Sequence, residues 1–141
     1  MFLCAVGRPR FHPESGECLF DGKIGIWPFI ERVAAQRNSA NRPRGTMVVK
    51  PRIVDRDTYL YMLLDELIPG ILTKHPQPDL AFPIRIQQDN AKPHIFPDNP
   101  DFVDAAANQG LQLNLVCQAA NSPDHNVCDL GFFNTIQALQ Q

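Results

Sequence analysis

Residues 83–94 read PIRIQQDNAKPH, and this stretch decides how the chain is expected to fold. Ile84 and Ile86 alternate with other residues, which is the pattern of a β-strand. The expected strand covers Pro83–Gln87 and is followed directly by the polar residues Gln88-Asp89-Asn90. We therefore expect a strand that delivers these polar side chains to one edge of a sheet.

A helix is expected upstream of this strand. Apolar residues recur at spacings of three and four from Leu60 to Leu72, which predicts an amphipathic helix. Asp55 and Asp57 stand near its start, where acidic groups interact favourably with the helix dipole. Pro69-Gly70 is expected to kink or divide the helix. A Pro-rich linker, Lys74–Pro83, then leads to the strand.

The segment downstream of the strand repeats the alternation. Pro93–Pro100 contains three prolines and is expected to be irregular. Asp101–Gln109 predicts a short amphipathic helix that ends at Gly110, and Leu111–Cys117 alternates like a second strand. Strands that alternate with helices predict an α/β layer fold with a mixed sheet. In such folds functional residues gather at the ends of strands.

The first third of the chain is expected to be mostly strand and loop. Phe2–Val6 and Lys23–Phe29 are apolar and predict two strands, with a hairpin loop over Phe11–Phe20 between them. Arg32–Arg52 shows no apolar period and is rich in Asn, Arg, Pro and Gly. We expect a basic loop there, with Met47–Val49 as a brief strand.

The charged residues divide the chain into a basic and an acidic part. Residues 1–56 hold ten of the 13 Lys and Arg but only five of the 15 Asp and Glu, so residues 57–141 hold three basic and ten acidic groups. Such asymmetry favours two partners of opposite sign, a phosphate backbone and a metal cation. An unevenly charged, solvated surface has the same pattern, and charge by itself leaves both interpretations open.

Length, cysteine usage and hydropathy bound the class of protein. With 141 residues, 44% of them hydrophobic, the chain fits one domain with a core of its own. The four cysteines show no C-x-x-C spacing and indicate reduced thiols inside the cell. Met1–Val6 is too short for a secretory signal, and no stretch reaches the roughly 20 apolar residues of a membrane span. We expect no membrane partner and a nuclear or cytoplasmic location.

Two polar segments carry the chemistry that the sequence suggests. One is Gln87–His94 at the end of the expected strand, and the other is Asn121–Asp129, which leads into an expected last helix over Asp129–Gln141. Mg²⁺ uses one or two carboxylates per ion, and two ions roughly 4 Å apart polarise the attacking and leaving oxygens of a phosphodiester. Asp89 and Asp129 are the candidate ligands. The alternative, that Asp89 is a turn residue and Asp129 a helix N-cap, stays open at this point.

These two segments resemble motifs of the mariner family of DNA transposases. "QDNAKPH" is similar to the second-carboxylate motif of that family, and "NSPDHNVCDLGFF" resembles the third-carboxylate motif. A subgroup of the family shows the same interval, with 39 residues between the two acids and Asp as the third one. "MFLCAVGRPRF", "GKIGIWPF" and "NRPRGT" also resemble linking parts of that subgroup, so the resemblance covers nearly the whole chain.

The resemblance implies a ribonuclease-H-like mixed sheet with flanking helices, in which residues 1–141 form part of a catalytic domain. Asp89 would be the second acid and Asp129 the third, both binding Mg²⁺ or Mn²⁺, with their carboxyl groups within about 10 Å of each other. Asp124 would hold the turn before Asp129. The family's first acid lies on a central strand upstream of the segment resembling "MFLCAV". We therefore expect the 141-residue chain to lack that strand and to be inactive by itself.

Nucleic-acid contacts are expected from the basic segment and from the loop after Asp89. Binding should be weak, independent of base sequence and sensitive to salt, because phosphate contacts release counterions. A second copy of the chain, in a homo-oligomer, is a further candidate partner. The residues expected to contact DNA are Arg37, Arg42, Arg44, Lys50, Arg52, Lys92 and His94.

Other functions compete with this interpretation. A non-catalytic nucleic-acid-binding or oligomerisation module would use the same basic segment, and an RNA nuclease would use the same fold. His125 and Cys128 depart from the family pattern, and with Cys117 they are conceivable Zn²⁺ ligands. Three ligands at loose spacing are a weak zinc signal, so the carboxylate site is the stronger hypothesis.

Overall fold

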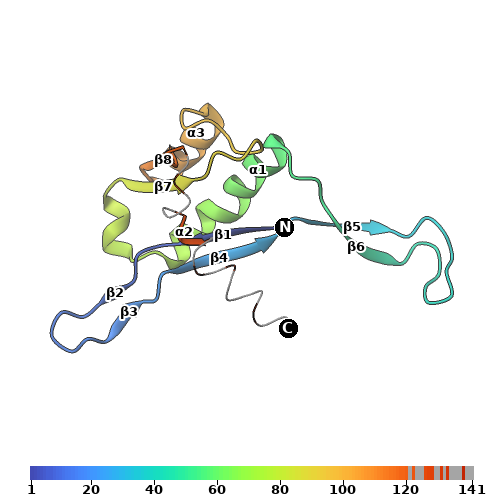
Figure 1. The fold of residues 1–141 in the computed structure, drawn as a ribbon, viewed down its shortest axis with the longest axis horizontal. Coiled ribbons are helices and arrows are strands. Elements are labelled where there is room, and N and C mark those ends of the chain that lie inside the picture. The colour runs from blue at the N-terminus through green and yellow to red at the C-terminus, as the bar shows by residue number, and fades with distance from the viewer. Residues whose placement is uncertain (121, 123–125, 129–130, 132, 134–137, 139–141) are drawn as a thin grey trace.

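The chain folds as a mixed α/β protein in which a helical layer lies against short strands (Figure 1). The computed structural model describes residues 1–120, 122, 126–128, 131, 133 and 138. Two hairpins extend from opposite ends of the body (Figure 1). The alternation of strands and helices expected from the sequence is confirmed. Most residues of the helix expected over Asp129–Gln141 lie outside the described residues, so that helix stays a prediction.

The first two long strands form an antiparallel pair. β1 (Phe2–Val6) pairs with β4 (Lys23–Pro28), with Leu3 opposite Trp27. The segment between them continues as a hairpin of β2 (Arg10–Phe11) and β3 (Cys18–Phe20). Both expected strands are therefore confirmed, and the expected hairpin loop includes two short strands.

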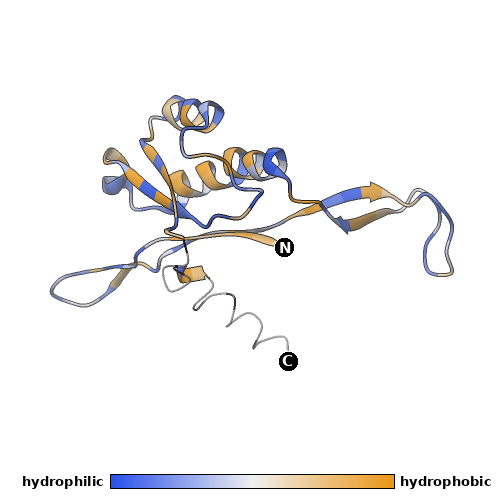
Figure 2. Cartoon of the chain, turned by 45° about the horizontal axis from the view of Figure 1, so that its top comes forward, coloured by the Kyte–Doolittle hydropathy of each residue, from blue (hydrophilic) through white to orange (hydrophobic). Residues whose placement is uncertain are grey.

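The basic segment is part of a second hairpin rather than a loop, which corrects the expectation for Arg32–Arg52, although the brief strand expected at Met47–Val49 is confirmed. β5 (Ile30–Ala34) pairs antiparallel with β6 (Met47–Pro51), and together they form an arm that extends from the body (Figures 1 and 2). The arm has no clear two-residue period because most of its side chains are exposed on both faces. Hydrophobic alternation marks a strand only where one face is buried.

A single helical run carries most of the core. α1 (Arg56–Met62) begins at Asp55, whose side chain accepts a hydrogen bond from the Thr58 N–H at 2.8 Å. A π-helical turn over Leu63–Leu67 then leads into α2 (Ile68–Lys74). The helix is therefore divided just before the expected Pro69-Gly70 position, and it continues through both residues. Among the described residues, no helix has the length and apolarity needed to cross a membrane.

The wider hydrogen bonding of the π turn accounts for the position of this division. The Ile68 N–H donates to the Leu63 carbonyl, five residues back. Proline has no N–H to donate and its ring crowds the preceding turn of an α-helix. A π turn placed immediately before Pro69 is a recognised way for a helix to continue past such an interruption.

A parallel strand pair follows the helical run. After a 3₁₀ turn over Gln77–Ala81, which replaces part of the expected linker, β7 (Ile84–Gln88) pairs in parallel with β8 (Leu113–Cys117). α3 (Pro100–Asn108) connects the two strands, as a parallel pair requires. Gly110 ends this connection with a φ of 72°, which glycine adopts without steric cost.

One hydrophobic core joins these elements. Leu63 in the π turn is 1% exposed, Phe102 on α3 is 0% exposed, and Ile95 in the loop before α3 is 2% exposed. Leu113 and Leu115 of β8 and Ile24 of β4 belong to the same cluster. Each fully buried large apolar side chain stabilises the fold by roughly 1.5–3 kcal/mol, so the core holds both strand pairs against the helical run.

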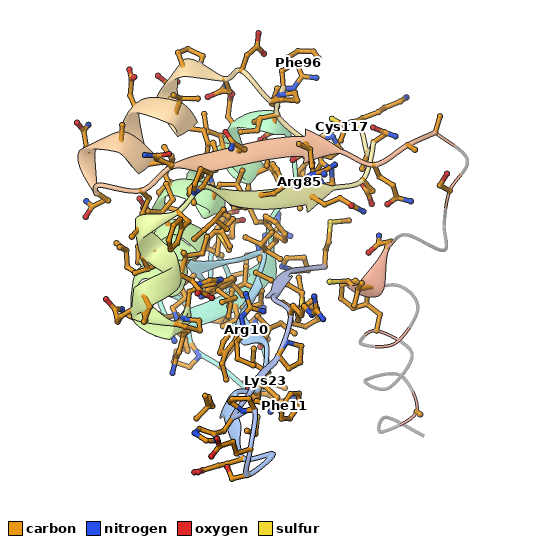
Figure 3. All side chains as sticks on the ribbon, turned by 90° about the vertical axis from the view of Figure 1, so that its left-hand side faces the viewer. Arg10, Phe11, Lys23, Arg85, Phe96 and Cys117 are labelled. Carbon is orange, nitrogen blue, oxygen red and sulfur yellow. The ribbon has the colours of Figure 1, made fainter. Side chains whose placement is uncertain are left out.

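The described residues do not form the single mixed sheet that was expected. Their strands make four two-stranded pairings: β1 with β4, β2 with β3, β5 with β6, and β7 with β8. In Figure 3 the parallel pair lies above the β1–β4 pair, with the helical run along one side. Direct pairing of β1 with β7 does not occur among the described residues. The core, rather than a hydrogen-bonded ladder, relates the two strand pairs.

Candidate functional site

Asp89 lies at the carboxyl end of the parallel strand pair. The ladder ends where Gln88 pairs with Cys117, and Asp89 is the next residue of the chain. Two further hydrogen bonds tie the start of this loop to the residue after β8. The Gln118 N–H donates to the Gln88 carbonyl at 2.7 Å, and the Asn90 side-chain amide donates to the Gln118 carbonyl at 2.8 Å. The strand end expected from the sequence is thus fixed on both sides of Asp89.

The two oxygens of the Asp89 carboxylate have different surroundings. Oδ1 accepts a hydrogen bond from the Ala91 N–H at 2.8 Å and lies 2.9 Å from Nδ1 of His94. The same Nδ1 lies 2.8 Å from the Asp89 carbonyl oxygen. Because both of these oxygens accept and cannot donate, Nδ1 carries the hydrogen. Oδ2 accepts no hydrogen bond from the described residues, and the side chain is 43% exposed.

A buried tyrosine supports His94 from below. The rings of Tyr59 and His94 lie with their centroids 4.4 Å apart, and the Tyr59 hydroxyl donates to Oε1 of Gln88 at 3.2 Å. The Gln88 amide donates in turn to the Ile95 carbonyl at 2.6 Å. Burial, and then the nearby Asp89 carboxylate, raise the pKa of Tyr59. The phenol therefore stays protonated and remains a donor, which holds the loop after Asp89 against α1.

This arrangement fits one carboxylate ligand of a hard divalent cation. Mg²⁺ accepts carboxylate oxygens, keeps several waters and needs only one or two carboxylates from protein. Oδ2 of Asp89 is accessible for that role, while Oδ1 is held in place by the loop. The described residues contain no cluster of three or more His, Cys, Asp or Glu side chains. Asp129, the second expected ligand, lies outside the described residues, so its approach to Asp89 stays a prediction. Asp124 also lies outside them, so its expected role in the turn stays a prediction.

The cysteines are arranged differently from the conceivable zinc set. Cys4 on β1 lies within hydrogen-bonding reach of Cys128, and burial together with Cys128 raises the pKa of Cys4 to about 12. Cys117, at the end of β8, is exposed. His125 lies outside the described residues. The contact with Cys4 places Cys128 beside β1.

The residues expected to contact nucleic acid fall into two groups. Lys92 is exposed on the loop after Asp89, and the His94 side chain, 19% exposed, belongs to the same loop and is engaged by Asp89. The others lie on the arm, far along the chain from that loop, and all are exposed: Arg37, Arg42 and Arg44 between its strands, Lys50 on β6 and Arg52 just after it.

The sequence analysis did not identify several residues that support this site. Tyr59 and Gln88 are buried supports of the loop, and Arg56 and Phe96 form a stack beside it, with the guanidinium carbon 4.7 Å from the ring centroid. A weak signal was present, because Arg56 and Tyr59 are three residues apart and so share a helix face. Their partners on the loop are more than 30 residues away in the chain, which no local pattern reveals.

Comparison of the chain with known protein families, curated proteins and solved structures finds no match. The functional assignment therefore depends on the residues and on the geometry of the Asp89 loop.

Proposed function

We propose that this chain is part of a ribonuclease-H-like catalytic domain of a mariner-like DNA transposase, which binds Mg²⁺ or Mn²⁺ through Asp89 and Asp129. The observation that carries the proposal is the placement of Asp89. Its carboxylate follows a parallel strand directly, is oriented through Oδ1 and leaves Oδ2 accessible. The resemblance of "QDNAKPH" to the family's second-carboxylate motif makes the same residue the metal ligand.

Each part of the loop has a role in this proposal. The Ala91 N–H and His94 orient the carboxylate, and Tyr59 supports the His94 ring. A bound divalent ion would polarise a phosphodiester and activate the attacking oxygen. Lys92 lies on the same loop and would contact a neighbouring phosphate.

Metal binding tests this proposal directly. Mn²⁺ titrated into the 141-residue chain, followed by electron paramagnetic resonance of the free ion, should reveal a site that Asp89→Asn weakens at least about tenfold. Asp104→Asn is the matched control, since Asp104 is an exposed aspartate on α3, away from the loop. Equal Mn²⁺ affinity in the wild type and in Asp89→Asn would contradict the proposal.

A second candidate function, a non-catalytic nucleic-acid-binding or oligomerisation module, is favoured by the arm. The arm presents exposed basic side chains together with exposed Met47 and Val49, which are 60% and 58% exposed. Duplex binding that is lost when the arm is replaced by a short turn, in a chain whose Mn²⁺ affinity does not depend on Asp89, would favour this module over the metal-dependent function.

A further inference from the structure

Two aromatic rings of the Asp89 loop stack on one face of α1. His94 lies against Tyr59, and Phe96, two residues further along, lies under the guanidinium of Arg56. Arg56 and Tyr59 are three residues apart on α1, so the two stacks are neighbours on the same helix face. The pair nearer to Asp89 is buried through Tyr59, whereas the second pair is open to solvent.

The Phe96 ring is largely exposed to solvent. It is 62% exposed and lies at the edge of the molecule, at the opposite end from Arg10, Phe11 and Lys23 (Figure 3). Arg56 is exposed, and among the described residues it forms no ion pair with a carboxylate. The guanidinium therefore has its charge available for a ligand. The pair offers an aromatic surface and a cation side by side.

A nucleobase matches this chemistry. Bases stack on aromatic side chains whatever their identity, and arginine adds a cation–π contact or a bond to the adjoining phosphate. A base inside a duplex has both faces covered by its neighbours, so only an unpaired base can use such a surface. We infer that Phe96 and Arg56 form a stacking site for an unpaired base of a single-stranded nucleic acid.

The position of this site links it to the proposed function, on which this step rests. The loop runs from Asp89 through His94 to Phe96, and α1 contacts it at His94 through Tyr59 and at Phe96 through Arg56. A strand whose phosphate is held beside Asp89 would place a nearby base at Phe96. Asp55, the residue before Arg56 in the chain, weakens the long-range positive potential of the site although it forms no ion pair with Arg56. Affinity here should therefore come from stacking more than from long-range attraction.

Binding of labelled oligonucleotides, measured by fluorescence anisotropy in EDTA, tests the inference without metal. The 141-residue chain should bind a 12-residue oligoadenylate about tenfold more tightly than an abasic oligomer of equal length, because only the former can stack. Phe96→Leu should lower affinity for oligoadenylate to the abasic level, while Phe96→Tyr should restore it. Arg56→Lys should weaken binding in the same direction, since lysine lacks the planar guanidinium.

The Arg52–Tyr61 stack provides a matched control. Its guanidinium carbon lies 5.5 Å from a Tyr61 ring that is 49% exposed, but Tyr61 is hydrogen-bonded to Asp65 and faces another side of α1. Tyr61→Leu should leave oligoadenylate affinity unchanged. Equal binding of oligoadenylate and the abasic oligomer by the wild type would overturn the inference, as would equal losses in Phe96→Leu and Tyr61→Leu.

These outcomes are separable from those of the metal test. Mn²⁺ affinity should be the same in Phe96→Leu and in the wild type, because Phe96 stacks with Arg56, whereas Asp89 is oriented by Ala91 and His94. Loss of Mn²⁺ binding in Asp89→Asn with base stacking intact would support both ideas. Intact stacking in a chain that binds no Mn²⁺ would overturn the proposed function and leave the stacking site standing.

Discussion

At the scale of single residues, the Asp89 carboxylate is held through only one of its oxygens. His94 reaches Oδ1 with an Nδ1–H group whose position the Tyr59 ring determines. Such partners of a metal ligand typically change metal affinity ten- to a hundredfold when they are removed. Removing His94 therefore tests whether the orientation of the Asp89 carboxylate affects binding of the proposed ion.

Replacement of His94 should separate orientation from packing. We expect His94→Ala to lower Mn²⁺ affinity about tenfold, because the carboxylate loses its side-chain donor. His94→Asn should retain most of the affinity, since its side-chain amide places an N–H near the position of Nδ1. Paramagnetic resonance of free Mn²⁺ measures both variants. Equal affinities in the two variants would show that the donor at Oδ1 has no part in binding.

The pKa of Cys4 leads to a prediction about thiol reactivity. Burial and Cys128 raise this pKa to about 12, well above that of an ordinary thiol, so at pH 8 almost no Cys4 is thiolate, the reactive form. Exposed Cys18 should be alkylated by iodoacetamide much faster than Cys4, as mass spectrometry of digests will show. Alkylation of Cys4 and Cys18 at the same rate would contradict the burial.

The same pKa affects stability. Because the pKa of Cys4 is higher in the folded state than in the unfolded state, the free energy of unfolding should fall as pH rises above 9.

At the scale of elements, Trp27 determines how closely β4 and α2 approach. A Cβ added at Gly25 would lie 2.2 Å from the Trp27 ring, and one added at Gly70 would lie 2.9 Å from it. The two glycines, one on the strand and one on the helix, leave the space that the indole occupies. The glycine inside α2 therefore has a packing reason that overrides its poor helix propensity.

Gly70→Ala should destabilise the protein despite alanine's preference for helices. Helix propensity favours alanine by about 1 kcal/mol, whereas forcing a methyl group against the indole costs about 1–3 kcal/mol. Urea unfolding should show a net loss of stability. In a Trp27→Leu background the same substitution should become neutral or stabilising, which a double-mutant cycle resolves. A stabilising Gly70→Ala in the wild type would contradict the contact.

The β5–β6 arm should dominate binding to duplex DNA. We expect the double substitution Arg42→Gln, Arg44→Gln to reduce the slope of log affinity against log salt by about 2, because two phosphate contacts are lost. Thermal unfolding should be unchanged, since both residues are exposed. Lys74→Gln, an exposed site on α2, is the control. Salt slopes that do not differ among the three proteins would exclude the arm as the phosphate-binding element.

At the scale of the whole molecule, exposed apolar side chains and strand edges should make the chain self-associate. Met47 and Val49 share one face of the arm with Ile30, which is 44% exposed. Two-stranded pairings leave backbone donors and acceptors at their outer edges, which invite pairing with other chains. Sedimentation velocity should show mass rising with protein concentration, and Met47→Lys with Val49→Lys should reduce it. A monomer at all concentrations would contradict this expectation.

Local pattern was sufficient where one face of an element is buried. β4, β7 and β8, the helical run and α3 were predictable, because burial imposes a period of two on strands and near 3.6 on helices, and β1 was predictable as a short apolar run. The position of Asp89 at a strand end was predictable for a related reason, since the alternation of Ile84 and Ile86 marks the strand that precedes it. The same reasoning missed β5, whose side chains are largely exposed and therefore follow no period.

Sequence by itself determined the α/β class, the strand end that carries Asp89 and the basic character of the arm. Only the tertiary structure decided that the basic segment pairs into a hairpin, that the strands form separate pairs, and that α1 supports the Asp89 loop through Tyr59 and Arg56. The physical reason is the distance along the chain over which each kind of interaction acts. Periodicity and turn chemistry act between neighbours in the chain, whereas these pairings depend on which distant segments the common core brings into contact.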